Sequence, residues 1–308
     1  MELLLQFALL ALGFVLLGKG ADWFVEGAAG IATRFGIPQL VVGLTIVAMG
    51  TSAPEAAVSI AAAIKGSADI TIGNIVGSNI MNILIILGLA AVITPLAVAR
   101  STVRVELPFV IAITGLLLYQ GVDGTISLAD GMVLCLAFAV YLIYLYTMAV
   151  KNKVDDDLQE YGYSLQRCLL ATAGGLVVII VGSNLTVNAA SAIAAYAGLS
   201  ERFIGLTIVA LGTSLPELFT SVTAARRGNA DIAIGNIVGS NIFNILFVVG
   251  LSALIIDIPF AAAFQFDSYV AIGTAALLWL CVLPKYRLNR WCGALMLACY
   301  AVYLWRIL

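Results

Sequence analysis

The sequence has no histidine and few charges, and each scarcity excludes a class of function. Without histidine the chain cannot build imidazole metal sites or catalytic triads that need an imidazole base. Only 10% of its 308 residues are charged, against about 25% in soluble domains. The net charge is −2, and no basic patch indicates nucleic-acid binding. Because 62% of residues are hydrophobic and the mean hydropathy is +1.09, we expect an integral membrane protein.

Cysteines and the N-terminus offer little chemistry. The five cysteines lie in apolar segments without CxxC spacing, so we interpret them as buried inert thiols rather than as a disulfide or metal site. Met1 and Glu2 are followed by leucines, without the basic region and cleavage site of a signal peptide. The first apolar stretch is therefore expected to be part of the mature protein, and no cofactor is indicated.

Apolar stretches long enough to cross a bilayer, roughly 20 residues each, recur along almost the whole chain. We predict an all-α membrane protein with ten transmembrane helices. The first and sixth exceed 30 residues, which implies a steep tilt across a hydrocarbon core of about 30 Å. The predicted spans are 3–33, 38–64, 69–92, 101–119, 127–150, 164–197, 202–225, 231–256, 267–283 and 288–306.

The distribution of basic residues predicts the orientation. If both termini lie outside the cytoplasm, eleven of the fifteen Lys and Arg residues fall in or beside inner loops, as the positive-inside rule requires. Lys65, Arg202 and Arg306 fall outside, and Lys19 lies within the first span. We therefore expect a multi-pass protein of the cell membrane with both termini extracytoplasmic.

An internal repeat organises the chain. Residues 43–89 recur 162 positions later as residues 205–251, and 32 of the 47 aligned pairs are identical. The halves 1–150 and 164–308 flank a polar linker, 151–163, which we interpret as a short cytoplasmic loop. With five spans each, the halves must be inverted relative to one another, a plan common in transporters.

The repeated motif places polar groups inside apolar helices. Thr51 and Glu55 share a helix face, and Pro54 removes a backbone donor, which predicts a broken helix with released carbonyl groups. Ser78 and Asn82 are also four residues apart. The second copy supplies Thr213, Ser214, Pro216, Glu217, Ser240 and Asn244.

Two glutamates inside a membrane need a reason, since each carboxylate costs about 2.5–3.5 kcal/mol to insert. Together with hydroxyls, amides and free carbonyls, Glu55 and Glu217 would form an all-oxygen cage with a charge of −2. Hard cations prefer such ligands, and Ca²⁺ takes about 6–8 oxygens. Zinc and copper are disfavoured because imidazole and thiolate ligands are missing. The alternative is a pair of protonated glutamates that only pack helices together.

The segments GTSAPE…GNIVGSNIMN and GTSLPE…GNIVGSNIFN resemble the two α-repeats of the sodium/calcium exchanger family, within the Ca²⁺/cation antiporter superfamily. The resemblance implies a secondary active antiporter of Na⁺ and Ca²⁺, and no enzymatic activity. Glu55 and Glu217 would bind Ca²⁺ and share it with Na⁺. Backbone carbonyls near Ala48, Thr51, Ala210 and Thr213 would complete the coordination. The remaining implied site residues, which line flanking Na⁺ sites or the middle of the cage, are Thr51, Ser52, Ser78, Thr213, Ser214, Ser240, Asn82 and Asn244.

One departure from the pattern bears on the coupling ion. Some relatives place an aspartate at the position of Asn244, and in potassium-dependent exchangers that aspartate is tied to K⁺. Amides at both Asn82 and Asn244 therefore suggest a K⁺-independent exchanger. A proton/calcium antiporter of the same superfamily remains an alternative, as does a cation channel with an acidic filter. The expected partners are the two ions and the lipid bilayer. No protein partner is implied, and a monomer suffices.

Three charges in the first span are not duplicated. Lys19, Asp22 and Glu26 lie on one helix face, whereas the residues 162 positions later are Val181, Asn184 and Asn188. We expect them to pair within their own helix. A sliding or gating surface is the alternative interpretation.

Overall fold

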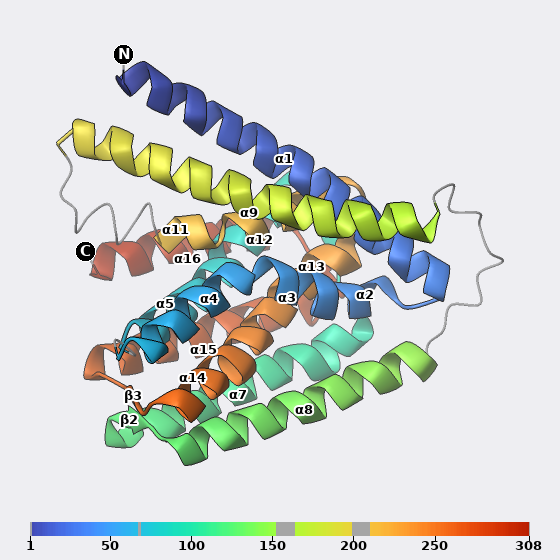
Figure 1. Ribbon diagram of the computed structural model, residues 1–308. Coiled ribbons are helices and arrows are strands. Elements are labelled where there is room, and N and C mark those ends of the chain that lie inside the picture. The colour runs from blue at the N-terminus through green and yellow to red at the C-terminus, as the bar shows by residue number, and fades with distance from the viewer. Residues whose placement is uncertain (1, 67–68, 152–163, 199–209, 308) are drawn as a thin grey trace.

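The computed structural model describes residues 2–66, 69–151, 164–198 and 210–307, which are almost entirely helical. The linker 152–163 and positions 202–209 of the seventh predicted span lie outside the described residues. Both ends of the drawn chain lie on the left of Figure 1, while α8 ends and α9 begins on the right. This arrangement agrees with termini on one side and a linker on the other.

Two long helices form one face of the molecule. α1 (Glu2–Phe35) and α9 (Leu165–Tyr196) lie side by side across the top of Figure 1. Glycines allow this close approach, because a side chain in their place would collide with the other helix. A Cβ on Gly20 would lie 2.9 Å from the Gly175 carbonyl oxygen, and a Cβ on Gly13 would lie 3.1 Å from the Gly182 carbonyl oxygen. Gly175 and Gly182 are the repeat equivalents of Gly13 and Gly20. Each helix therefore presents the same small-residue face to the other.

Broken helices that carry the repeated motif fill the centre. The first copy comprises α2 (Gln39–Val42), η1 (Gly43–Val47), α3 (Ala48–Thr51), α4 (Ala53–Ile64), α5 (Asp69–Met81), η2 (Asn82–Leu87) and α6 (Gly88–Ile93). The described part of the second copy comprises α11 (Ala210–Thr213), α12 (Leu215–Arg226), α13 (Ala230–Phe243), η6 (Asn244–Val249) and α14 (Gly250–Ile255). η1, η2 and η6 are π-helical turns.

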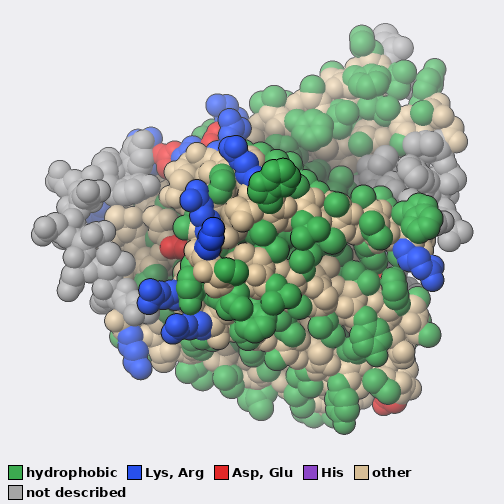
Figure 2. Space-filling model, turned by 180° about the vertical axis from the view of Figure 1, so that it is seen from behind, with side chains coloured by type: hydrophobic (Ala, Val, Ile, Leu, Met, Phe, Trp, Pro, Cys, Tyr) green, Lys and Arg blue, Asp and Glu red, His purple; other side chains and the backbone are tan. Residues whose placement is uncertain are grey.

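Burial confirms that the motif helices are central. In the segments 71–93 and 230–255, 78% and 83% of the most apolar window is buried, against 17% in α1 and 22% in α8 (Leu128–Lys151). On α8 the side chains of Leu136, Ile143 and Tyr146 are 68%, 63% and 71% exposed. Figure 2 shows hydrophobic side chains spread widely over the visible surface, as expected of a protein in contact with lipid.

The remaining helices surround this centre, and four two-residue strands fasten their ends. The helices are η3 (Thr102–Glu106), α7 (Leu107–Gln120), η4 (Gly121–Asp123), α15 (Ala262–Val282) and α16 (Arg290–Ile307). β1 (Leu96–Ala97) pairs antiparallel with β4 (Arg287–Leu288), with Leu96 opposite Leu288. β2 (Thr125–Ile126) pairs antiparallel with β3 (Ile258–Pro259), with Thr125 opposite Pro259. Adding 162 to β1 and β2 gives β3 and β4, so the two pairings are equivalent.

Among the described residues, seven helices are long and apolar enough to cross a membrane, and a bent pair makes an eighth. The seven single helices correspond to the predicted first, third, fourth, fifth, sixth, eighth and ninth spans, with ends that differ by up to five residues. The bent pair, 39–51 with 53–64, corresponds to the second. The count of ten stays a prediction, since the seventh span is only partly described and α16 is a helix of 18 residues that carries arginines near both ends.

Candidate ion-binding site

The motif helix breaks where the sequence predicts it. The segment before Ser52 and the segment after it are bent by 50°, and Ser52 has a non-helical conformation with φ −81° and ψ 6°. Pro54 occupies the first turn of the new helix α4, where its missing N–H has no intrahelical partner to lose. The second copy breaks in the same way at Ser214, with φ −89° and ψ 3°, ahead of Pro216.

Both glutamates lie in the first turn of the second half-helix. Glu55 and Glu217 follow the break by three residues, and both are fully buried with 0% exposure. The start of a helix carries a partial positive charge from its free N–H groups, which favours an anionic side chain there. Each break therefore places a carboxylate deep in the molecule and gives it local electrostatic support.

Hydroxyl groups from the opposite half contact each carboxylate. The Ser52 hydroxyl donates to Glu217 Oε1 at 2.8 Å. Ser214, its repeat equivalent, lies 3.5 Å from Glu55 Oε1, and Ser78 lies at the same distance. The Ser78 and Ser214 hydroxyls are 3.1 Å apart. The structure thus brings the two predicted motifs together into one buried polar cluster.

Four buried oxygens of the predicted site residues have no hydrogen-bond partner among the described residues. They are one carboxylate oxygen from each glutamate, Oε2 of Glu55 and of Glu217, and the side-chain oxygens of Asn82 and Asn244. A buried acceptor left unpaired costs about 1–3 kcal/mol, so four among the predicted site residues call for an explanation. All four are hard oxygen ligands, and two belong to carboxylates. Such a set can coordinate a Ca²⁺ or Na⁺ ion.

Asparagines hold the two halves together around these oxygens. The amide of Asn79 donates to the Asn241 carbonyl at 3.1 Å, and the amide of Asn241 donates to the Asn79 carbonyl at 3.1 Å. The Asn82 amide donates to Asn241 Oδ1 at 3.0 Å, and the Asn244 amide donates to Asn79 Oδ1 at 3.1 Å. Because these bonds use the NH₂ groups of Asn82 and Asn244, their oxygens are left available.

Asn79 and Asn241 are functional candidates that the sequence analysis missed. A signal was present, since both are polar residues repeated at the same place in an apolar helix. Asn236 and Asn74 are a further repeated polar pair, to which the sequence analysis assigned no role in the site. The Asn236 amide donates to the Ser221 hydroxyl at 2.9 Å, and the equivalent Asn74 donates to Ser59 at 3.0 Å.

The remaining predicted site residues line the same region. The Thr51 hydroxyl lies 3.0 Å from Asn236 Oδ1 and 3.1 Å from the Val47 carbonyl. The Ser240 hydroxyl donates to the Ala48 carbonyl at 3.3 Å, and that carbonyl also accepts the Ser52 N–H at 3.0 Å. The Ala48 carbonyl is therefore already hydrogen-bonded. Ala210 and Thr213 begin and end α11.

A third buried carboxyl lies outside the repeated motif. Glu106 is 1% exposed, accepts a hydrogen bond from the Tyr144 hydroxyl, and has one oxygen without a partner among the described residues. Its repeat equivalent is Ser268, so this acid is not duplicated. The sequence analysis did not identify it, because nothing in the surrounding sequence repeats or marks it.

The charges on α1 pair differently from the prediction. Asp22 and Glu26 both bind Arg227, which follows α12, at 2.9 Å and 3.3 Å. The predicted pairing of Lys19 with these acids within α1 is wrong, because Arg227 reaches them from another helix. Burial alone would lower the pKa of Arg227, but the hydrogen bonds and charges of the two carboxylates outweigh it and raise the pKa. The bridge ties α1 to the end of α12.

Comparison with known proteins identifies the family of this chain. The family described as "Sodium/calcium exchanger protein" matches residues 5–147 and 168–308. A "Putative antiporter CaxA" of Alkalimonas amylolytica is 41% identical, covering 94% of this chain and 95% of that protein. "Inner membrane protein YrbG" of Escherichia coli is 40% identical over 82% of this chain and 81% of its own length.

Two further similarities concern proteins with exchanger names. "Sodium/calcium exchanger MaX1" of Methanosarcina acetivorans is 30% identical, with 97% of each chain covered. A solved structure of the sodium–calcium exchanger NCX_Mj, soaked with 2.5 mM Na⁺ and 10 mM Sr²⁺, superposes with a TM-score of 0.86 at 34% identity over 98% of each chain. The match extends over both halves and the whole fold, and this chain therefore belongs to the sodium/calcium exchanger family, whose members are multi-pass membrane transporters.

Proposed function

We propose that this protein exchanges Na⁺ for Ca²⁺ across the membrane by alternating access, with both ions competing for one site between its halves. The observation that carries the proposal is the set of four unpaired buried oxygens contributed by Glu55, Glu217, Asn82 and Asn244. Carboxylates supply the charge of −2 that balances one Ca²⁺. Na⁺ that enters down its gradient would displace Ca²⁺ from the same oxygens.

The hydroxyl groups around the cage are the proposed flanking ligands for Na⁺. Ser52, Ser78, Ser214 and Ser240 are all buried, and all contact either a glutamate or the Ala48 carbonyl. Hydroxyls can rotate away from a hydrogen bond and offer a lone pair to a cation. The backbone carbonyls of Ala48, Thr51, Ala210 and Thr213 are proposed to complete the coordination once an ion binds.

We further propose that the chain has ten transmembrane helices in two inverted repeats, 1–150 and 164–308. The support is that cross-contacts occur in equivalent pairs at an offset of 162. The contacts Asn79–Asn241, Gly13–Gly182 with Gly20–Gly175, and β1–β4 with β2–β3 all obey this rule. A two-fold axis in the membrane plane would generate such pairs.

The sidedness of the molecule follows from its basic residues. Figure 2 shows Lys and Arg side chains gathered toward one end of the visible face. By the positive-inside rule that end is cytoplasmic, so we propose that both termini face outward from the cell membrane. The long, closely packed α1 and α9 are proposed to move against the central helices during transport, since few of their side chains are buried.

Amides at positions 82 and 244 favour a K⁺-independent exchanger, because they leave the charge to the two glutamates alone. The proton/calcium antiporter is the rival that shares this site, since carboxylates bind protons as well as metal ions. Buried hydroxyls beside each glutamate favour Na⁺ over protons. A channel is a weaker rival, because the two glutamates and the two asparagines Asn82 and Asn244 are fully buried.

The coupling ion can be tested in liposomes that contain the purified protein. Uptake of ⁴⁵Ca²⁺ is measured while a Na⁺, K⁺ or H⁺ gradient is imposed alone, and the double variant E55Q/E217Q serves as the blank. We expect uptake with an outward Na⁺ gradient and none above the blank with the other two. Uptake driven by a pH gradient without sodium would replace this proposal with the proton/calcium antiporter. Single-channel currents would replace it with a channel.

A further inference from the structure

A cavity of about 610 Å³ lies between α1 and α12, away from the ion-binding site. Its volume is within the range of about 300–1,000 Å³ typical of ligand sites. Apolar side chains line one part of it, among them Phe14, Val15 and Phe219. The basic side chains Lys19 and Arg226 line another part. The cavity therefore has the two-sided character of an amphiphile, with an apolar wall and a cationic end.

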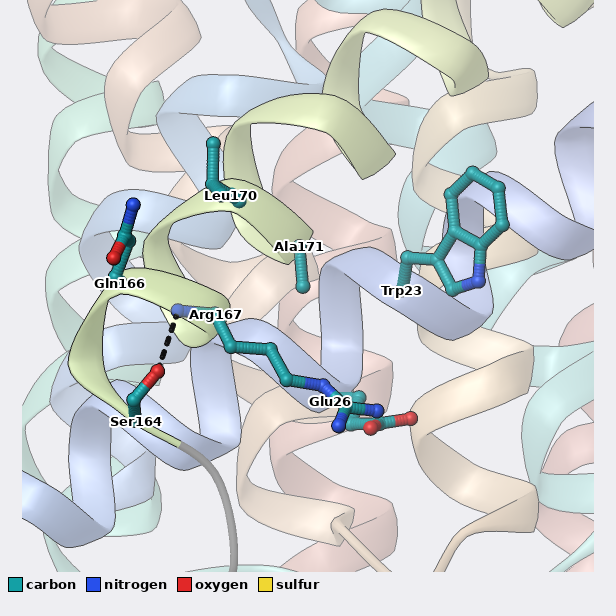
Figure 3. Close-up of a pocket in the computed structure, with 7 residues that line it drawn as sticks. All are labelled: Trp23, Glu26, Ser164, Gln166, Arg167, Leu170 and Ala171. Carbon is teal, nitrogen blue, oxygen red and sulfur yellow. Dashed lines mark hydrogen bonds between the residues drawn. The ribbon is translucent and has the colours of Figure 1, made fainter.

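Asp22 and Arg227 also line the cavity, but the nearby acids do not neutralise Lys19 and Arg226. Asp22 and Glu26 are both bound to Arg227. A neighbouring cavity of about 500 Å³ on the other side of Glu26 contains Arg167, whose side chain runs toward Glu26 in Figure 3. Two arginines thus face the acids, while Lys19 and Arg226 have no ion pair among the described residues. A bound anion would relieve the repulsion between them.

The other half of the molecule provides an internal comparison. The repeat equivalent of Lys19, 162 residues later, is Val181, and the repeat equivalent of Arg226, 162 residues earlier, is Ile64. Both replacements are apolar and are 51% and 69% exposed, as lipid-facing residues are. The cationic end is therefore not a by-product of the repeat. Of the two equivalent places among the described residues, the one where α1 meets α12 has the cationic side chains that favour a negative headgroup.

We propose that this cavity binds a membrane phospholipid with an anionic headgroup. Lys19 and Arg226 hold the phosphate, and one acyl chain runs along the apolar wall formed by Phe14, Val15 and Phe219. A phospholipid fits because the cavity opens between two membrane helices, and basic pockets between such helices bind anionic headgroups. A free inorganic anion would leave the apolar wall unfilled. The lipid would bridge α1 and α12 beside the Arg227 ion pair.

The test compares lipids and variants of the full chain in detergent, with bound lipid counted by native mass spectrometry. Phosphatidylglycerol is the anionic probe and phosphatidylcholine the zwitterionic one. The variant K19Q/R226Q removes both cations, and K65Q/K285Q removes the same charge elsewhere. Each cation near a membrane surface contributes about fivefold in affinity, so the first variant should bind phosphatidylglycerol about 30-fold more weakly. K65Q/K285Q should bind like the unaltered protein.

A second variant separates the apolar wall from the charges. Val222→Trp fills the cavity without altering a charge, and it should also release phosphatidylglycerol, provided that its melting temperature matches that of the unaltered protein. The proposal is overturned if K19Q/R226Q and K65Q/K285Q retain the lipid equally, or if phosphatidylcholine binds as tightly as phosphatidylglycerol. It is also overturned if equimolar inorganic phosphate displaces the lipid, because the site would then hold a free anion.

Discussion

The centre of the molecule and its α1–α12 edge differ in how closely their contacts obey the internal repeat. At the centre, many polar contacts have a counterpart 162 residues away, as Asn79 and Asn241 illustrate. At the edge, Arg227 binds Asp22 and Glu26, whereas the equivalent Lys65 would face Asn184 and Asn188. A site that opens to each side in turn benefits from equivalent halves. A feature that distinguishes the two sides of a membrane must break that equivalence.

The centre also contains a small asymmetry. Ser52 lies 2.8 Å from Glu217, whereas Ser214 lies 3.5 Å from Glu55. The Ser52 contact with its carboxylate is therefore shorter than the equivalent contact of Ser214. Variants of equivalent residues can show where the two-fold equivalence holds and where it fails.

The largest expected effect is on the glutamates. Glu55→Gln and Glu217→Gln should each lower Na⁺-driven ⁴⁵Ca²⁺ flux by at least about 100-fold, about 2.7 kcal/mol, because each removes half of the charge of the cage. Glu106→Gln is the matched control, since it neutralises a buried carboxyl outside the motif and should leave flux within about threefold. A large loss in only one of the two motif variants would show that the halves do not share the ion.

The next effect is on stability. Asn79→Ala and Asn241→Ala should each cost about 1–3 kcal/mol, because each leaves buried partners in the other half unsatisfied. In thermal unfolding assays in detergent this corresponds to a fall of roughly 2–10 °C. The two falls should match each other, and the exposed Thr147→Ala should show none. Unequal falls would contradict the equivalence of the two contacts.

A smaller effect should separate the two serines. Ser52→Ala should weaken Ca²⁺ binding about 10-fold, since a hydrogen bond to a charged group contributes about 1.5–3 kcal/mol. Ser214→Ala should weaken it by less than about threefold, because its contact is long. Titration calorimetry with Ca²⁺ measures both, and Ser252→Ala, a buried serine whose hydroxyl has no partner among the described residues, is the control. Equal losses for Ser52 and Ser214 would remove the asymmetry.

The smallest effect is at the edge. Arg227→Gln should lower stability by no more than about 1 kcal/mol, because its ion pairs are partly exposed and are screened by salt. The loss should shrink at high ionic strength, whereas Lys65→Gln should have no effect at any salt concentration. Melting curves of lipid-free protein in low and high salt test this. A loss that does not depend on salt would mean that Arg227 acts by packing.

The centre could be predicted from sequence because the repeat singles out its residues. Thr51, Ser52, Glu55 and their counterparts stand out as polar matches between apolar segments, and Pro54 marks the break. The roles of Asn79 and Asn241 were missed because the hydrogen bonds that join them connect residues 162 apart. The π-helical turns after Met81 and Phe243 were not predicted either, because an extra residue in a turn depends on tertiary packing.

The edge could not be predicted, for a related reason. Lys19, Asp22 and Glu26 have the spacing of ion pairs within one helix. In the structure Arg227 lies close to Asp22 and Glu26, and both acids bind it instead of Lys19. Glu106 has no distinguishing neighbours in sequence, and its hydrogen bond with Tyr144 of α8 is seen only in the folded structure. An internal repeat makes functional residues recognisable in the sequence when both copies contain them. The contacts of residues that occur in one copy alone can be identified only from the three-dimensional structure.

The central claim is that one divalent ion is held jointly by Glu55 and Glu217. Crystals grown in Ca²⁺ and measured at a long wavelength would locate the ion by its anomalous scattering. We predict one peak per chain at about 2.3–2.6 Å from an oxygen of each glutamate, which weakens when Na⁺ is added. Separate peaks at the two carboxylates, or no peak between them, would contradict this account.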